Sequence, residues 1–93
     1  MDEKVIRRVV RVSGRVQGVG FRWAAADAAQ DLGVTGTVRN LLNGTVEADV
    51  EGPAEAVDRM LEWLAEGPPS ARVSGTEVRD ADPRGTSGFR IAG

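Results

Sequence analysis

The stretch GRVQGVGFR, residues 14–22, joins two segments whose hydrophobic patterns differ. Before it, residues 5–12 are rich in valine, and β-branched residues are typical of a strand. After it, apolar residues recur at the spacing of one helix face; these are Phe21, Ala24, Ala25, Ala28, Ala29 and Leu32. The sequence therefore predicts a strand that passes into a helix through a glycine-rich, basic loop.

Such a loop favours an anion, and phosphate is the expected ligand. Glycines let successive backbone N–H groups point at one spot, and the helix start adds its own N–H groups and the positive end of its dipole. Arg22 falls in the first turn, where a cation opposes the dipole unless an anion is bound between them. The alternative is a purely structural loop, because GxxxxGK[ST] is absent and Trp23 occupies the last position of GxGxxG.

The rest of the chain predicts a single domain over residues 1–93. Asn43-Gly44 is a hairpin signal, and Val46, Ala48 and Val50 alternate with polar residues, which indicates a strand with one dry and one wet face. Strands are expected over residues 5–12, 35–41, 45–51, 72–79 (with a bulge at Gly75) and 89–91, and helices from Phe21 to a cap at Gly33 and from Gly52-Pro53 to Gly67. This order predicts an α+β fold of the ferredoxin-like split βαβ type, an antiparallel sheet of four to five strands with two helices on one face.

The amino-acid composition limits which metal ligands and catalytic groups the protein can use. The 93 residues include no cysteine and no histidine, which removes thiolate metal sites and the commonest general base. Neither motif holds spaced carboxylates for magnesium, so no metal and no cofactor are expected. No leader or long apolar run is apparent, which favours a cytoplasmic protein that does not bind membranes.

Charge is distributed unevenly. The formal net charge of −2 argues against a general nucleic-acid binder. Residues 1–22 hold six basic side chains and two acidic ones, Asp2 and Glu3, a formal charge of +4 that would steer an anion toward this segment. The alternative is that arginines such as Arg7 and Arg11 decorate a solvated strand.

Asn40 is the second candidate site residue. It shares parity with Val38 on the strand TGTVRNL, so both side chains are expected on the helix-covered side of the sheet. The alternative is that Asn40 starts the hairpin turn by bonding its own backbone.

These motifs resemble the acylphosphatase family. GRVQGVGFR is similar to its signature loop and GTVRNLLNGTVE to its second signature, and the resemblance extends from about Val9 to about Val78. It implies a hydrolase of acyl phosphates, with inorganic phosphate as product and inhibitor. The lack of spaced carboxylates in the motifs favours a reaction without a metal ion, and the short chain favours a monomer. The tail FRIAG lacks the family's usual carboxyl-terminal aromatic residue, and Asn43 stands where aspartate is usual.

The resemblance also implies roles for individual residues. Arg22 would clamp the phosphoryl group and Asn40 would orient the attacking water. The phosphate cradle would be the backbone of six consecutive residues, Arg15, Val16, Gln17, Gly18, Val19 and Gly20. Gln17 matches the motif, but the sequence suggests no role for its side chain.

Two other functions fit the fold. An RNA-binding module would stack bases on aromatic residues of the open sheet face, but of the four aromatic residues only Phe89 falls on an expected strand. A regulatory or accessory domain could bind an anion without hydrolysing it, or act on carbamoyl phosphate within a larger assembly. Turnover of an acyl phosphate would separate a hydrolase from a binder.

Overall fold

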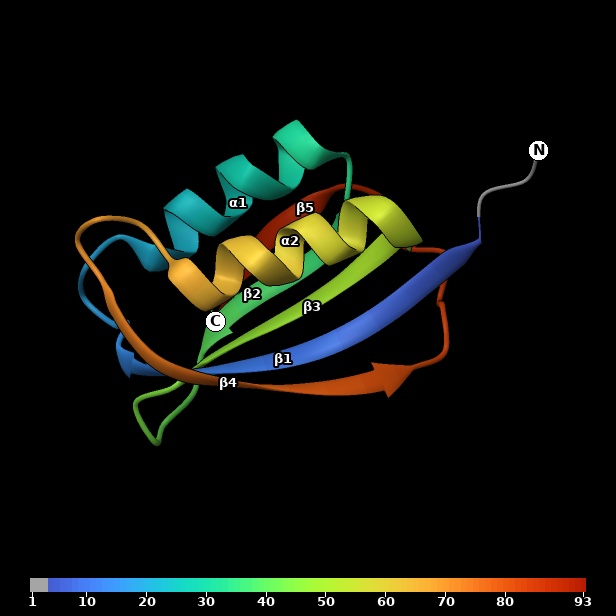
Figure 1. Cartoon of the computed structure of the whole chain (residues 1–93). Helices are drawn as coiled ribbons and strands as arrows, with labels where there is room; N and C mark the ends of the chain where they lie inside the picture. The colour runs from blue at the N-terminus through green and yellow to red at the C-terminus, as the bar shows by residue number, and fades with distance from the viewer. Residues whose placement is uncertain (1–3) are drawn as a thin grey trace.

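Two helices lie side by side on one face of a five-stranded sheet (Figure 1). The computed structural model describes residues 4–93, so Asp2 and Glu3 of the basic first segment lie outside the described residues. The elements are β1 (Val5–Arg15), α1 (Phe21–Leu32), β2 (Thr35–Asn40), β3 (Val46–Pro53), α2 (Ala54–Glu66), β4 (Arg72–Ala81) and β5 (Phe89–Ala92). The expected ferredoxin-like α+β architecture is confirmed.

The sheet has the strand order β4-β1-β3-β2-β5. The first four strands in this order pair antiparallel, as expected, but β5 pairs parallel with β2, so the sheet is mixed. The reason lies in the connection from β4. Residues 82–88 cross the sheet at the end where β2 begins, and β5 therefore enters the sheet in the direction of β2.

The core lies between the sheet and the helices. Val10, Val12, Val46, Ala48 and Val50 project from the central strands and are nearly or fully buried. Across from them α1 buries Phe21, Ala25 and Ala29, and α2 buries Val57, Met60 and Leu64. Small alanine side chains let α1 lie close to the sheet. Gly33 ends α1 in the left-handed conformation, with its N–H donated to Ala29 and Gln30 carbonyls, which confirms the predicted cap.

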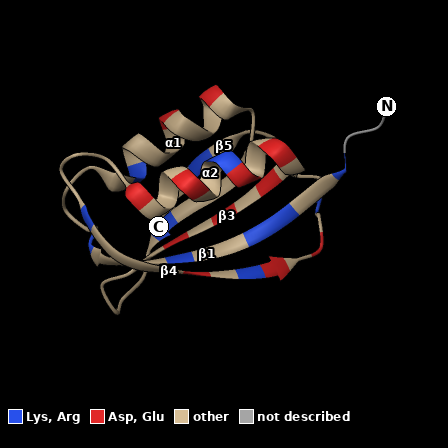
Figure 2. Cartoon of the chain, viewed as in Figure 1, with Lys and Arg blue, Asp and Glu red and all other residues tan. Residues whose placement is uncertain are grey.

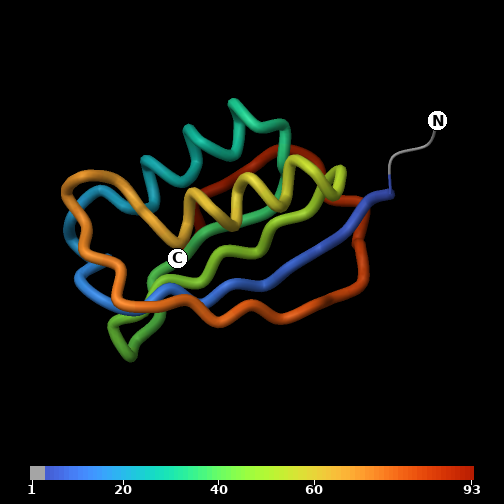
Figure 3. The backbone as a smooth tube through the Cα atoms, viewed as in Figure 1, coloured from blue at the N-terminus to red at the C-terminus, as the bar shows by residue number. Residues whose placement is uncertain are grey.

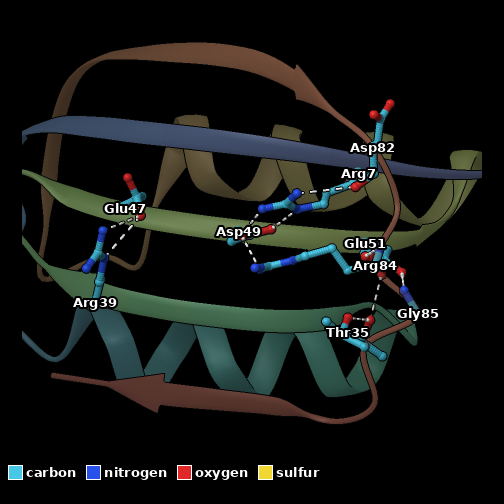
Figure 4. Close-up of polar contacts among 10 residues, drawn as sticks. Arg7, Thr35, Arg39, Glu47, Asp49, Glu51, Asp82, Arg84 and Gly85 are labelled. Atoms are coloured by element: carbon cyan, nitrogen blue, oxygen red, sulfur yellow. Dashed lines mark hydrogen bonds and ion pairs between the residues drawn. The ribbon is translucent and has the colours of Figure 1, made fainter.

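The outward face of β3 is not exposed to solvent along its whole length, although the alternation of apolar and polar residues predicts that it is. Glu51 is only 3% exposed, and its carboxylate accepts the backbone N–H groups of Arg84 and Gly85 at 2.8 and 2.7 Å (Figure 4). The connection between β4 and β5 covers this carboxylate. The N–H of Arg84 is the largest cause that lowers the pKa of Glu51 below its ordinary value.

Arg7 likewise does not decorate a solvated surface. Its guanidinium holds both carboxylate oxygens of Asp49 at 2.9 and 2.8 Å, and Arg84 adds a third contact to the same carboxylate (Figure 4). The hydrogen bond from Arg7 lowers the pKa of Asp49. Arg11, by contrast, is exposed and forms no ion pair with any described residue.

Acidic side chains predominate on α2 and on the later turns of α1, whereas β1 carries mainly basic ones (Figure 2). The two helices have 12 and 13 residues. In the part of the chain that the structure describes, no helix is long and apolar enough to cross a membrane.

Candidate active site

Several segment ends meet at one end of the sheet. β1 ends there and α1 begins there, while β2 ends and β3 begins beside them (Figure 3). The end of α2 and the start of β4 reach the same place. Three connections therefore gather at this end: residues 16–20, residues 41–45 and residues 67–71.

The next-to-last residue of β1 is a glycine that no other residue could replace without moving β4. Gly14 has φ +122°, and a Cβ built on it would lie 2.1 Å from the carbonyl oxygen of Arg72. The register of β1 with β4 shifts at this point, because Ser13 pairs with Gly75 and Gly14 pairs with Val73. The bulge is therefore present, but its extra residue is Ser74 and not Gly75, where the sequence predicts it.

The loop that follows presents backbone donors. Gly18 and Gly20 adopt left-handed φ values of 74° and 78°, on either side of Val19. Alternation of this kind turns successive N–H groups to one side and forms an anion-binding concavity. Within residues 4–93, the N–H groups of residues 16–20 donate to no protein acceptor.

The start of α1 adds to this positive concavity. Its N-cap is Gly20, which has no side-chain oxygen to accept the first N–H groups, and its first turn contains no acidic residue. Serine, threonine, aspartate or asparagine at the cap would accept one of these N–H groups with its side chain. The N–H groups and the dipole of α1 are therefore directed to the same place as the loop.

Two arginines border the loop. Arg22 is half-buried in the first turn of α1 and forms no hydrogen bond or ion pair with any residue from 4 to 93. Arg15 is exposed and lies opposite Arg72 of β4. No carboxylate of the described chain neutralises Arg15 or Arg22, so this end of the sheet keeps its positive charge.

Asn40 is the last residue of β2. Its strand partner is Val46, which is fully buried on the helix side, so Asn40 also lies on that side. Its Oδ1 is buried and has no hydrogen-bond partner among the described residues. Nearly all buried polar atoms have a partner, so this oxygen requires an explanation.

The alternative reading of Asn40 as a turn former is wrong. The side chain that organises the hairpin turn is Asn43, whose Oδ1 accepts the backbone N–H of Thr45 at 3.1 Å and its hydroxyl at 2.6 Å. Asn40 makes no such bond. Its amide oxygen remains available for a group outside the chain.

Sequence reasoning missed two side-chain contacts that hold the loop. The Nε2 of Gln17 donates to the carbonyls of Leu41 and Thr45 at 2.8 and 2.9 Å, which ties the loop to the β2–β3 hairpin. On the other side, the hydroxyl of Ser70 donates to the carbonyl of Val19 at 2.6 Å. Only the motif match of Gln17 could have drawn attention to the first contact.

A groove between α1 and α2 is another possible binding site, but the negative charge of its lining disfavours an anion. Its floor includes Trp63 and Leu32, but Asp27, Asp31 and Glu66 line it with only Arg59 as a cation. Negative side chains repel a phosphate. Within residues 4–93, no three carboxylates are grouped as a metal ion would require.

Both the sequence and the fold are similar to those of known proteins. A family model described as Acylphosphatase matches residues 8–91. The chain is 50% identical to an acylphosphatase of Thermococcus kodakarensis, over 97% of this chain and 99% of that one, and 54% identical to one of Anaeromyxobacter dehalogenans, over 95% and 94%. The solved structure of an acylphosphatase from Coxiella burnetii matches with a TM-score of 0.90 at 39% identity, over 95% of this chain and 93% of that chain.

Proposed function

Because the chain belongs to the acylphosphatase family, and is thus an acylphosphatase, we propose that it hydrolyses the carboxyl–phosphate bond of small acyl phosphates at the end of the sheet described above, without a metal ion. The products are a carboxylate and inorganic phosphate. The observation that carries the proposal is the buried oxygen of Asn40 beside the loop of residues 16–20. Among residues 4–93, neither this oxygen nor the N–H groups of the loop have a hydrogen-bond partner in the protein.

The cradle of residues 15–20 binds the phosphoryl group. Phosphoryl transfer passes through a loose transition state whose charge is spread over three equatorial oxygens. Backbone N–H groups fixed in advance stabilise this charge without reorganising during the reaction. The guanidinium of Arg22 holds two of these oxygens. The bound anion then lies between the positive charge of Arg22 and the positive end of the α1 dipole, which offsets the repulsion between them.

Asn40 orients the attacking water. Its amide oxygen accepts a hydrogen bond from the water, which supplies the partner that residues 4–93 do not provide for this atom. Gln17 supports this arrangement, because it links the loop that holds the phosphoryl group to Leu41, the residue after Asn40.

The leaving group accounts for the absence of histidine. A carboxylate departs as a stable anion, so no strong acid is required to protonate it. The oxygens of the substrate accept the proton of the water. Catalysis then depends on alignment and electrostatics, which backbone amides, one guanidinium and one amide can supply.

The proposal is tested with purified protein and a simple acyl phosphate, such as benzoyl phosphate, in the presence of EDTA. We expect hydrolysis that EDTA does not reduce and that inorganic phosphate inhibits competitively. Thermal unfolding with and without phosphate gives a separate measure of binding. Stabilisation by phosphate with no turnover would identify an accessory anion-binding domain, and loss of turnover in EDTA would contradict the metal-independent mechanism.

A further inference from the structure

Ser70 lies outside both sequence motifs, in the connection between α2 and β4. Two backbone hydrogen bonds and two prolines constrain this connection. Its first residue, Gly67, donates its N–H to Trp63 at the end of α2, and the N–H of Ala71 bonds the carbonyl of Pro68 at 3.0 Å. Pro68 and Pro69 fix their own φ angles. The hydroxyl of Ser70 is therefore presented from a preformed turn.

That hydroxyl contacts the cradle at one atom. Its Oγ donates to the carbonyl oxygen of Val19 at 2.6 Å, a short hydrogen bond between residues 51 positions apart. The carbonyl of Val19 and the N–H of Gly20 belong to the same peptide group. All described peptide bonds are trans, so this N–H points away from the carbonyl and hence away from Ser70.

We propose that Ser70 is a positioning residue of the phosphate cradle: by holding the Val19 carbonyl, it aims the Gly20 N–H at the phosphoryl group. The inference rests on the proposed function, because it assigns the direction of one amide of that same site. Gly20 is also the N-cap of α1, so the amide lies where the loop and the helix dipole converge.

The side chain of Val19 packs against the core, but the glycines on either side of it leave the orientation of the 19–20 peptide group weakly determined. Gly18 and Gly20 flank Val19, and a Cβ added to either glycine would meet no atom within 4 Å. Glycine adopts φ values of either sign about equally well. The 19–20 peptide can therefore rotate at small cost, and the bond from Ser70 selects the orientation in which the N–H faces the cradle.

The proposal is tested with Ser70→Ala, Ser70→Thr and the control Ser87→Ala. Ser87 is exposed, lies at the other end of the sheet and forms no hydrogen bond with a described residue. For Ser70→Ala we expect the inhibition constant of inorganic phosphate and the KM for benzoyl phosphate to rise about three- to tenfold. The value of kcat should change less, because this one amide also bonds the phosphoryl group of the bound substrate, and the other N–H groups of the cradle still stabilise the transition state.

Further measurements distinguish a positioning role of Ser70 from a purely structural role. Ser70→Thr keeps a hydroxyl and should restore the wild-type inhibition constant, and the Tm of Ser70→Ala without phosphate should stay close to that of Ser87→Ala. In NMR titrations, the phosphate-induced shift of the Gly20 amide should shrink in Ser70→Ala. A lower Tm with an unchanged inhibition constant would overturn the proposal. Absence of turnover in the wild type would instead contradict the proposed function.

Discussion

Arg22 breaks a local rule of helix stability, since a cation in the first turn opposes the helix dipole and no described carboxylate compensates it. A bound phosphoryl group would account for it. Arg22→Ala is therefore expected to cost about 3 kcal/mol or more in transition-state stabilisation, measured from kcat/KM. It should also weaken inhibition by phosphate.

The matched control for this variant is Arg11→Ala, which removes an exposed arginine that no described residue pairs with. It lowers the net charge equally but leaves the cradle intact. Residual turnover of Arg22→Ala above about a tenth of wild type, or an equal loss in Arg11→Ala, would rule out the clamp, because the expected effect of one preorganised donor is larger.

The variant Asn40→Ala is expected to lower activity without lowering stability. Asn40→Ala should lower kcat about a hundredfold, the typical cost of one lost orienting or stabilising group, with little change in phosphate affinity. The free energy of unfolding should not fall, because the variant removes a buried oxygen that has no partner among the described residues. Both quantities are measurable, by steady-state kinetics and by urea unfolding.

Asn43→Ala is the contrasting control in the same hairpin. It removes two hydrogen bonds to Thr45, so we expect lower stability with kcat nearly unchanged. Loss of phosphate affinity with normal kcat in Asn40→Ala would contradict the role of Asn40 in orienting the water.

At the scale of elements, the side-chain amide of Gln17 joins the phosphate cradle to the β2–β3 hairpin. Gln17→Leu leaves the carbonyls of Leu41 and Thr45 without this donor and frees the hairpin to shift relative to the loop. We expect kcat to fall more than phosphate affinity, since the hairpin carries Asn40. Unfolding measurements should show a cost of about 1–3 kcal/mol.

Gln17→Glu sharpens this test. A carboxylate would face two carbonyl oxygens and repel both, so it should lower stability and kcat further than the apolar leucine does. If Gln17→Glu retained wild-type kcat and stability, the bridge between loop and hairpin would be irrelevant to both.

Local sequence signals predicted the elements well, because each depends on neighbours in the chain. The helical stripe from Phe21, the Gly33 cap and the Asn43-Gly44 hairpin are all signals of this kind. Two element boundaries differ from the predicted ones: β1 continues to Arg15, and Pro53 is the N-cap that precedes α2 rather than part of its first turn.

What the sequence could not predict depends on segments that meet only after folding. Gln17 and Leu41 are 24 positions apart, Glu51 and Arg84 33, and Ser70 and Val19 51. The parallel entry of β5 and the burial of Glu51 both follow from the path of residues 82–88 across the sheet. The sequence identified the groups of the candidate site, whereas the contacts that hold the site are tertiary.

For the whole molecule, the cradle and the principal carboxylate network occupy opposite ends of the sheet. Asp49 and Glu51 are held by Arg7, Arg84 and backbone N–H groups near the start of β1, whereas the cradle follows its end. Protonation of this network should therefore act on folding rather than directly on the chemistry.

The pH dependence of stability follows from the sign of these shifts. Native contacts lower the pKa of Glu51 and of Asp49 below their ordinary values of 4.5 and 3.8. A carboxylate with a lowered native pKa contributes stability that is fully present above its unfolded pKa and is lost as pH falls through the native value. We therefore expect the urea midpoint to be constant near neutral pH and to fall steadily below about pH 4.5.

Glu51→Gln tests whether the carboxylate of Glu51 contributes to this pH dependence of stability. An amide cannot accept the N–H groups of Arg84 and Gly85 as a carboxylate does, so we expect a loss of about 1–3 kcal/mol at pH 7. The loss should shrink toward pH 3, where the wild type has itself lost the charged contact. Glu77→Gln, at an exposed position of β4, should leave the acid profile unchanged. An equal loss from Glu51→Gln at pH 7 and pH 3 would show that packing around residue 51, and not its charge, holds the connection between β4 and β5 in place.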